Sequence, residues 1–246
     1  MCSSDLLRGQ RADGRLVPPG DFIPVLEESG LIVPAGAWVL RAACAQLRAW
    51  QDAGIEPVPI AVNLSAKQFH QQNIGAMVQV ALQEYAVNPR LLDLEITESA
   101  AMHDAKATTT TLHGLKALGV RIAIDDFGTG YSSLSYLKSF PIDALKIDRS
   151  FVTELPGNRG DASIAKAVIT MAHALGLKVI AEGVENEAQL TFLAENSCDE
   201  MQGYFFSRPL PAAACTQFLD QRRQLPVLPA PGHRRKPLAL ACATAT

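Results

Sequence analysis

The stretch of sequence that decides the fold is LLDLEITESAAMHDAKATTTTLHGLKALGVRIAIDD, residues 91–126. It opens with a short apolar run, Leu91–Ile96, and closes with another, Val120–Asp125. Between them lies Asp104–Leu118, a longer run in which apolar residues recur with helical spacing. A strand, a helix and a second strand in this order predict two parallel strands joined by a helix that packs on one face of their sheet.

The same alternation continues on both sides of this stretch. The further predicted strands are Val58–Leu64, Ala144–Ile147, Lys178–Ala181 and Met201–Phe205. The further predicted helices are Pro34–Ala53, Gln71–Tyr85, Ser133–Lys138, Asp161–Leu175, Glu187–Asn196 and Ala212–Gln224. In the first helix an apolar stripe recurs at helical spacing and is expected to face the core: Trp38, Leu40, Ala43, Cys44 and Leu47. Repeated strand–helix units predict an α/β fold, a parallel sheet with helices outside it.

The amino-acid composition limits the classes of protein to which the chain can belong. The chain has 246 residues, with 22 Lys+Arg and 25 Asp+Glu, a net charge of 22 − 25 = −3, and 48% of its residues are hydrophobic. These values are typical of a globular protein, and they exclude a disordered chain or a strongly basic partner of a nucleic acid polymer. No apolar run approaches the roughly 18 residues that cross a bilayer. We therefore expect a cytoplasmic chain, although a full-length parent could be tethered to a membrane.

The five cysteines are scattered and form no CxxC motif. They are Cys2, Cys44, Cys198, Cys215 and Cys242. This pattern predicts reduced thiols rather than a disulfide framework or a zinc site.

Polar residues lie at or just after the end of each predicted strand. They are Asn63, Glu95, Glu98, Asp125, Asp126, Lys146, Asp148, Glu182, Glu185 and Gln202. In a TIM-like (β/α)8 barrel of about 250 residues such side chains would meet at one mouth, where barrel enzymes place their chemistry. An open doubly wound sheet gathers ligands at one switch point, so it fits this series of strand ends less well.

The polar series predicts a metal site for phosphate chemistry. Its hard oxygen ligands are Asn63, Glu95, Asp125 and Asp126. Brought together they would repel one another unless cations neutralise them, and oxygen-only clusters favour Mg²⁺ or Mn²⁺. Two metals about 3.5–4 Å apart suit the hydrolysis of a phosphodiester. Lys146 could then neutralise charge on the attacking hydroxide or a phosphate oxygen, and Glu182 could orient or deprotonate the water.

Each part of the series also has a structural interpretation. The Asp125-Asp126 pair could cap a turn before Gly128. Lys146 and Asp148 could be a solvated ion pair beside a strand. Asn63-Leu64-Ser65 could be only a strand end followed by a helix cap.

Six segments, taken in chain order, closely resemble the EAL-domain cyclic-di-GMP phosphodiesterases. They are Val62–Ser65 (VNLS), Glu95–Glu98 (EITE), Asp125–Ser133 (DDFGTGYSS), Leu145–Asp148 (LKID), Ala181–Glu185 (AEGVE) and Gln202–Tyr204 (QGY). The resemblance runs from about Leu7 to Asp220. It implies a TIM-like barrel of the EAL type that hydrolyses cyclic di-GMP to linear pGpG with Mg²⁺ or Mn²⁺, two ions being expected.

The resemblance also implies roles for individual residues. The implied metal ligands are Asn63, Glu95, Asp125 and Asp126, and the residues implied to handle the nucleophilic water are Lys146 and Glu182. Glu98 is implied to hold the loop after the paired Asp, a loop that the family also uses in dimer contacts. The other implied supporting residues are Asp148, Glu185 and Gln202, and Arg8 is implied to contact the ligand phosphate.

The start of the chain departs from the family pattern. Ser4-Asp5-Leu6 stands where Glu-Ala-Leu is expected, and the usual first barrel strand has no counterpart before Met1. We expect residues 1–6 to be a non-native or frayed start, residues 7–224 to form the EAL-type domain without its first strand, and residues 225–246 to be a disordered tail. An artificial start is favoured over genuine decay because every downstream motif is intact.

Three functions remain open from the sequence. The main hypothesis is a cyclic-di-GMP phosphodiesterase, impaired in this truncated form. It would form a homodimer through the loop after Asp126, with sensory or diguanylate cyclase (GGDEF) domains upstream in a full-length protein. The alternative is a degenerate cyclic-di-GMP receptor or an interaction scaffold, which Ser4 favours. A barrel enzyme for another phosphate ester is the weakest of the three.

Overall fold

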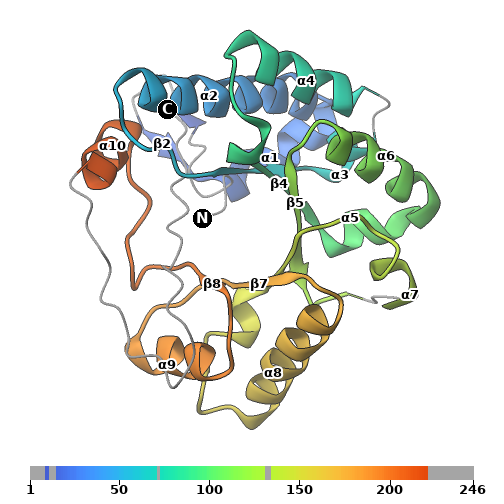
Figure 1. Cartoon of the computed structure of the whole chain (residues 1–246), viewed down its shortest axis with the longest axis vertical. Helices are drawn as coiled ribbons and strands as arrows, with labels where there is room; N and C mark the ends of the chain where they lie inside the picture. The colour runs from blue at the N-terminus through green and yellow to red at the C-terminus, as the bar shows by residue number, and fades with distance from the viewer. Residues whose placement is uncertain (1–8, 11–14, 71–72, 131–133, 221–246) are drawn as a thin grey trace.

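A computed structural model of the chain describes residues 9–10, 15–70, 73–130 and 134–220. Six parallel strands form a sheet whose spatial order follows the chain, β3-β4-β5-β6-β7-β8. These strands are β3 (Ile60–Leu64), β4 (Leu92–Thr97), β5 (Arg121–Phe127), β6 (Ala144–Ile147), β7 (Lys178–Ala181) and β8 (Glu200–Met201). The sheet curls around a central space, so the described strands form part of a TIM-like barrel (Figure 1). The predicted α/β class is confirmed.

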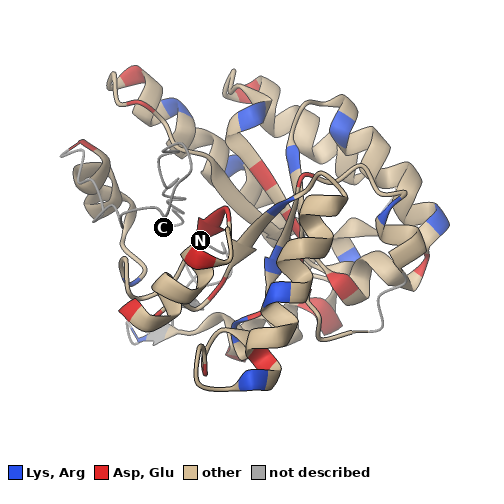
Figure 2. Cartoon of the chain, turned by 60° about the horizontal axis from the view of Figure 1, so that its bottom comes forward, with Lys and Arg blue, Asp and Glu red and all other residues tan. Residues whose placement is uncertain are grey.

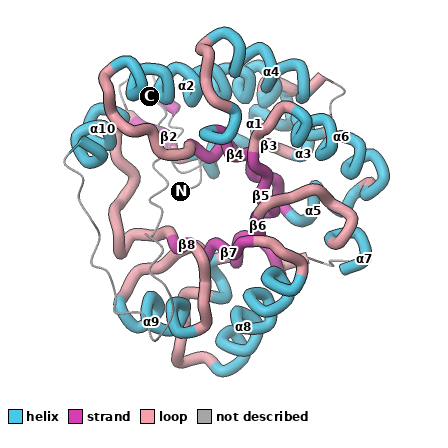
Figure 3. The backbone as a smooth tube through the Cα atoms, in the orientation of Figure 1, coloured by secondary structure: helices cyan, strands magenta, loops and turns pink. Residues whose placement is uncertain are grey.

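The helices lie outside the curled sheet (Figure 3). They are α2 (Ile32–Asp52), α3 (Ala66–Phe69), α4 (Ile74–Glu84), α5 (Glu98–His103), α6 (Ala105–Ala117), α7 (Leu134–Leu137), α8 (Arg159–Ala174), α9 (Glu187–Glu195) and α10 (Ala212–Asp220), with the 3-10 turns η2 (Pro89–Leu91) and η3 (Arg149–Phe151). Lys and Arg are interspersed with Asp and Glu over these outer helices (Figure 2).

Two features before the sheet were not predicted. β1 (Gly9–Gln10) and β2 (Leu16–Val17) pair as a short antiparallel hairpin, and α1 (Pro19–Ser29) follows. The sequence gives little sign of α1, because Pro24 lies inside the helix and no residue of α1 is buried. A helix without a buried stripe shows no hydrophobic periodicity, and an interior proline normally argues against helix.

The predicted strand Met201–Phe205 is wrong in its extent. Strand β8 ends at Met201, and the backbone turns at Gly203, whose φ is 155°. A Cβ at Gly203 would lie 2.2 Å from the carbonyl oxygen of Val184, so the chain passes too close to its neighbour for any larger residue. Pairing resumes irregularly beyond the turn, where the N–H of Phe205 donates to the Val184 carbonyl at 2.9 Å.

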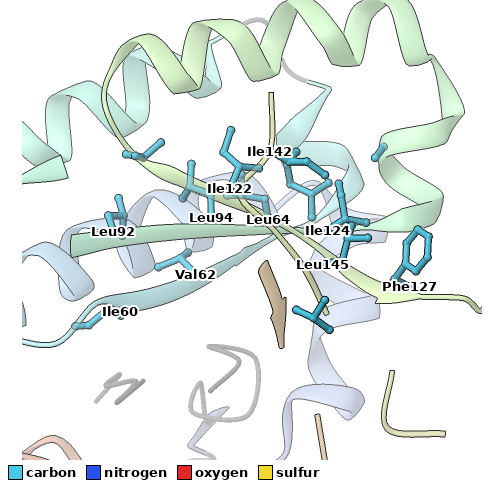
Figure 4. Close-up of a cluster of buried hydrophobic side chains, with 14 of the residues drawn as sticks. Ile60, Val62, Leu64, Leu92, Leu94, Ile122, Ile124, Phe127, Ile142 and Leu145 are labelled. Carbon is cyan, nitrogen blue, oxygen red and sulfur yellow. The ribbon is translucent and has the colours of Figure 1, made fainter. Parts of the chain in front are cut away.

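The main hydrophobic core lies between the outer face of the sheet and the helices. Alternate residues of β3 to β6 contribute buried side chains to it (Figure 4): Ile60, Val62, Leu64, Leu92, Leu94, Ile122, Ile124, Phe127 and Leu145. Helix α2 adds most of its predicted stripe, since Leu40, Ala43, Cys44 and Leu47 are buried. Trp38 is 46% exposed, so the expectation that it faces the core is wrong; it lies on a different side of the helix from the other four. Burial of each large aliphatic side chain contributes roughly 1.5–3 kcal/mol.

The remaining expectations about the chain have mixed outcomes. Cys44 and Cys198 are free, as predicted, whereas Cys215 is disulfide-bonded, so the prediction of reduced thiols is wrong there. The absence of CxxC excludes local pairing but not pairing between distant positions.

None of the described helices combines the length and apolar character needed to cross a lipid bilayer. Residues 1–6 and 225–246, expected to be a frayed start and a disordered tail, lie outside the described residues.

Candidate active site

Strand register places the predicted ligands of β3, β4 and β5 on one face of the sheet. Asn63 lies opposite Glu95, and Thr97, two residues further along β4, lies opposite Asp125. Residues paired across two strands share a face, as do residues two apart along one strand. Asn63, Glu95 and Asp125 therefore all point to the inner face, away from the hydrophobic core.

The same reasoning extends to β6 and β7. Ala144 lies opposite Ala123 of β5, so Lys146 shares the inner face with Asp125. Lys146 in turn lies opposite Ile180, and Glu182 follows two residues later. The N–H of Glu182 donates to the carbonyl of Ile147 at 3.2 Å, which continues the pairing of the two strands up to the glutamate.

A β-bulge brings the second aspartate to the same place. Ile124 lies opposite Leu145 and Phe127 lies opposite Ile147, so the two residues Asp125 and Asp126 stand where β6 has Lys146 alone. The φ of Asp126 is 53°, a left-handed conformation that an aspartate tolerates better than most residues. In a regular strand the two carboxylates would point to opposite faces. Here oxygen atoms of Asp125, Asp126 and Glu182 lie within 4.8 Å of one another.

Lys146 occupies the centre of the site. Its side chain is fully buried, and its Nζ atom lies 2.8 Å from Glu95, 3.1 Å from Asp125 and 2.5 Å from Glu182. A buried ammonium group needs paired charges to offset its loss of hydration. Three carboxylates around one ammonium leave a formal charge of 1 − 3 = −2 before Asp126 is counted.

Two carboxyl groups of the site bind protons unusually tightly. Burial raises the pKa of Glu182 to about 7; the negative charge of Asp125 adds to the rise, and Lys146 opposes it. Burial likewise raises the pKa of Asp126 to about 6, with repulsion from Asp125 and Asp148 adding to the rise. Burial therefore disfavours the charged forms of both carboxyl groups, and the neighbouring negative charges add to this effect.

The donor set fits a hard divalent cation. The clustered oxygens of Asp125, Asp126 and Glu182, with Glu95 and Asn63 on the same face, include no soft ligand. Oxygen-only sites of this kind suit Mg²⁺ or Mn²⁺ better than zinc or copper.

Glu98 is buried at the start of α5 and contacts the loop that follows the paired aspartates. Its Oε2 accepts the N–H of Gly128 at 2.9 Å. A Cβ at Gly130 would lie 2.9 Å from Glu98 Oε1, so the loop closes tightly on the carboxylate. Thr97 caps α5 by accepting the N–H of Ala100 at 3.3 Å, which fixes where that helix begins.

The other predicted supporting residues differ in position. Gln202 donates from Nε2 to Glu182 Oε1 at 2.5 Å, and Asp148 is near enough to Asp126 to raise its pKa. Glu185 is exposed, and its carboxylate makes no hydrogen bond or ion pair within the described part of the chain. Arg8 lies outside the described residues. The roles implied for Glu185 and Arg8 stay predictions.

The interpretation of Lys146 and Asp148 as a solvated ion pair is wrong, because Lys146 is fully buried and pairs with Glu95, Asp125 and Glu182. The interpretation of strand ends followed by caps holds alongside the site. Ser65 caps α3 in a capping box with Gln68, as expected if Asn63-Leu64-Ser65 is a strand end followed by a cap. Asp148 caps η3 by accepting the N–H of Ser150 at 2.9 Å. The same segments therefore both terminate strands and carry the polar residues of the site.

Sequence reasoning missed Gln189, a buried side chain on α9. It forms a capping box with Asn186, a pattern readable as Asn-x-x-Gln at the start of a helix. It also missed the ion pair of Asp93 with Arg121, one layer below Glu95 on the inner face. The signal there was a charged residue on the inner face of each of two neighbouring strands, Asp93 two positions before Glu95 and Arg121 four positions before Asp125.

Comparison with known proteins places this geometry in a family. A family model described as "EAL domain" matches residues 5–209. MucR of Pseudomonas aeruginosa, named a bifunctional diguanylate cyclase/cyclic di-GMP phosphodiesterase, is 49% identical over 207 residues, which make up 84% of this chain and 30% of MucR. YkoW, a signaling protein of Bacillus subtilis, is 47% identical over 217 residues, 88% of this chain and 27% of YkoW. The chain thus spans less than a third of the length of these curated relatives.

Solved structures show the same likeness. The PaMucR phosphodiesterase in complex with c-di-GMP is 48% identical, covers 85% of both chains and superposes with a TM-score of 0.82. The EAL domain of DcpA from Mycobacterium smegmatis is 43% identical, covers 76% of this chain and 84% of its own, and superposes with a TM-score of 0.72.

Proposed function

The chain belongs to the EAL domain family, and from that membership we propose that it is a metal-dependent phosphodiesterase that hydrolyses cyclic di-GMP to linear pGpG. The observation that carries the proposal is the bulge that sets Asp125 and Asp126 opposite the buried Lys146. Relatives named as cyclic di-GMP phosphodiesterases, and a PaMucR structure that holds c-di-GMP, support this choice of substrate.

We propose that the oxygen ligands hold Mg²⁺ or Mn²⁺, with two ions in the complete site. The residues proposed to hold them are Asn63, Glu95, Asp125 and Asp126. Bound divalent cations supply positive charge that stabilises the transition state of phosphodiester cleavage. The excess negative charge around Lys146 supports this assignment.

Lys146 and Glu182 are proposed to manage the attacking water. The carboxylate of Glu182 lies beside those of Asp125 and Asp126, a position that suits a group that accepts a proton from an attacking water. Lys146 lies beside it and provides positive charge next to the oxygen that loses the proton. Gln202 donates a hydrogen bond to the same carboxylate oxygen of Glu182, so the orientation of this carboxylate does not depend on Lys146 alone.

A receptor that binds cyclic di-GMP without hydrolysing it is the second candidate. It is favoured by Ser4, which stands where the family has its signature glutamate. Loss of one anionic ligand weakens the affinity for metal more than the affinity for the nucleotide, so binding without turnover is the expected property of such a chain.

We also propose that two copies of the chain associate through the segment after Asp126. Leu134 and Tyr136 of α7 follow this segment and are 57% and 50% exposed, which supports an apolar contact there. The cytoplasmic location and the upstream sensory or diguanylate cyclase domains stay predictions.

The deciding experiment measures conversion of cyclic di-GMP to pGpG by chromatography, with Mg²⁺ or with EDTA. It compares the chain as given with the same chain preceded by an EAL-type N-terminal segment and carrying Glu at position 4. Mg²⁺-dependent pGpG formation by the completed chain supports the enzyme. Binding of cyclic di-GMP without turnover by both chains favours the receptor.

A further inference from the structure

We infer that Gln189 is a positioning residue that holds the loop carrying Glu182 against the loop carrying Asp148; this inference rests on the proposed function. Gln189 lies on α9, away from the inner face of the sheet, and its side chain is only 2% exposed. A buried amide of this kind is stable only when its donor and acceptor atoms have partners.

The carbonyl oxygen of the Gln189 side chain binds the loop after β7. Its Oε1 accepts the N–H of Glu185 at 2.7 Å and the N–H of Asn186 at 3.1 Å. The backbone of this loop pairs with the 202–205 segment only through Val184. Beyond Val184 the two N–H groups need another acceptor, which Gln189 provides.

The amide nitrogen of the same side chain binds the loop after β6. Its Nε2 donates to the carbonyl of Thr153 at 2.8 Å. Thr153 is tied back to the start of η3, because its N–H donates to the carbonyl of Arg149 at 2.9 Å. Asp148 immediately precedes this turn, so Gln189 connects the segments that carry Asp148 and Glu182.

The two loops touch where Gln189 joins them. Gly183 has a φ of 71°, and a Cβ there would lie 2.7 Å from Cβ of Arg149. A shift of either loop would therefore move the other. Glu182 directly precedes Gly183, so its carboxylate depends on this contact for its distance from Lys146 and Asp125. A misplacement near 1 Å at a catalytic group can cost about 10²-fold in rate.

Gln68 is a matched control for Gln189. It is also a buried glutamine, 3% exposed, at the same position of a capping box, with Ser65 as the cap. Its Oε1 accepts the N–H of Ser65 at 3.2 Å, but its Nε2 has no hydrogen-bond partner among the described residues. Substitution of Gln68 therefore removes a helix cap without releasing a connection between two site loops.

The test compares Gln189→Met and Gln68→Met in the full chain. Gln189→Met should lower the melting temperature more than Gln68→Met, because it removes three side-chain hydrogen bonds whereas Gln68→Met removes one. Of the two variants, only Gln189→Met should weaken Mn²⁺ binding, by about 10-fold as measured by electron paramagnetic resonance. Only Gln189→Met should also lower kcat, by about 10- to 100-fold, with KM changed less than twofold. Gln189→Glu keeps the acceptor and loses the donor to Thr153, so it should lose less Mn²⁺ affinity and less kcat than Gln189→Met. It is the variant to measure where Gln189→Met folds poorly.

Mn²⁺ affinity separates this inference from the proposed function. Absence of turnover in a chain completed with an EAL-type N-terminal segment and Ser4→Glu would overturn the proposed function. Mn²⁺ binding would still report the placement of Glu182, because a carboxylate oxygen of Glu182 lies within 4.8 Å of those of Asp125 and Asp126. The inference is overturned if both Gln189 variants keep wild-type Mn²⁺ affinity, or if Gln68→Met weakens it equally.

Discussion

Nζ of Lys146 lies 2.5 Å from Oε1 of Glu182, and the same oxygen accepts a hydrogen bond from Gln202 at 2.5 Å. One oxygen of the carboxylate thus has two partners, while burial favours the protonated form of the acid. An acid in this environment changes its protonation state near neutral pH.

Asp125→Asn should abolish hydrolysis in a chain completed at its N-terminus. The neutral amide keeps the shape of the side chain but cannot offset the charge of divalent cations. Cyclic di-GMP binding should persist in Ca²⁺, whose looser coordination positions water poorly. Turnover at saturating Mg²⁺ is the measurement, and Asp52→Asn, on the exposed surface of α2, is the control. Near-normal turnover by Asp125→Asn would remove this residue from the metal site.

Lys146→Ala and Glu182→Ala should each lower kcat by an estimated 10²–10⁴-fold, with a much smaller effect on substrate affinity. Lys146→Ala also leaves three buried carboxylates without their cation, so it should destabilise the metal-free chain by about 3–5 kcal/mol. Steady-state kinetics and urea unfolding measure the two effects. Glu187→Ala, at the exposed start of α9, should change neither. A variant that raises only KM would mark its residue as a binding group.

The metal-free chain should lose stability as pH rises from about 4 to about 7. The folded chain holds protons on Asp126 and Glu182 up to pH values near 6 and 7, whereas the unfolded chain releases them near the ordinary carboxyl pKa. The folded state therefore binds more protons over this range, and its advantage declines as pH increases. Melting temperatures in EDTA should fall across this window, and Mg²⁺ should remove the decline. Asp126→Asn should flatten the EDTA curve; an unchanged curve would contradict the pKa assigned to Asp126.

The strand positions and the inner-face residues could be predicted because both follow from alternation along the chain. Apolar residues such as Leu94 and Ile96 face the helices, which leaves Glu95 between them for the inner face. The bulge at Asp126 could not be predicted in this way, since it depends on the register between β5 and β6 and not on either strand alone.

Other elements escaped prediction for different physical reasons. Helix α1 buries no side chain, so it leaves no periodic pattern in the sequence. Gln189 donates one hydrogen bond to the distant Thr153, and its capping-box pattern indicates only the local contacts. The early end of β8 follows from the close approach of Gly203 to Val184, which only the assembled sheet defines.

Tyr136→Asp and Leu134→Asp should lower the proportion of dimer. Both side chains are exposed on α7, and a buried charge would oppose an apolar contact between two copies. Light scattering coupled to size exclusion measures the change. Val80→Asp, a substitution of an apolar residue 49% exposed on α4, is the matched control. Equal dimer content in all three variants would place the contact elsewhere.

Activity should depend on a segment that precedes the sheet. Among the described strands, β3 and β8 each pair on one side only, and unpaired edges favour association between chains. The family resemblance expects a strand and a glutamate before Leu7, where this sequence has Ser4. Ser4→Glu alone should restore little turnover, because a metal ligand needs a paired backbone segment to hold its carboxylate in place. The same glutamate on an added EAL-type segment should restore Mg²⁺-dependent conversion of cyclic di-GMP to pGpG and reduce association. Turnover and oligomer size of the three chains, measured side by side, decide the matter: equal turnover by the unaltered chain would show that neither the strand nor the glutamate is needed.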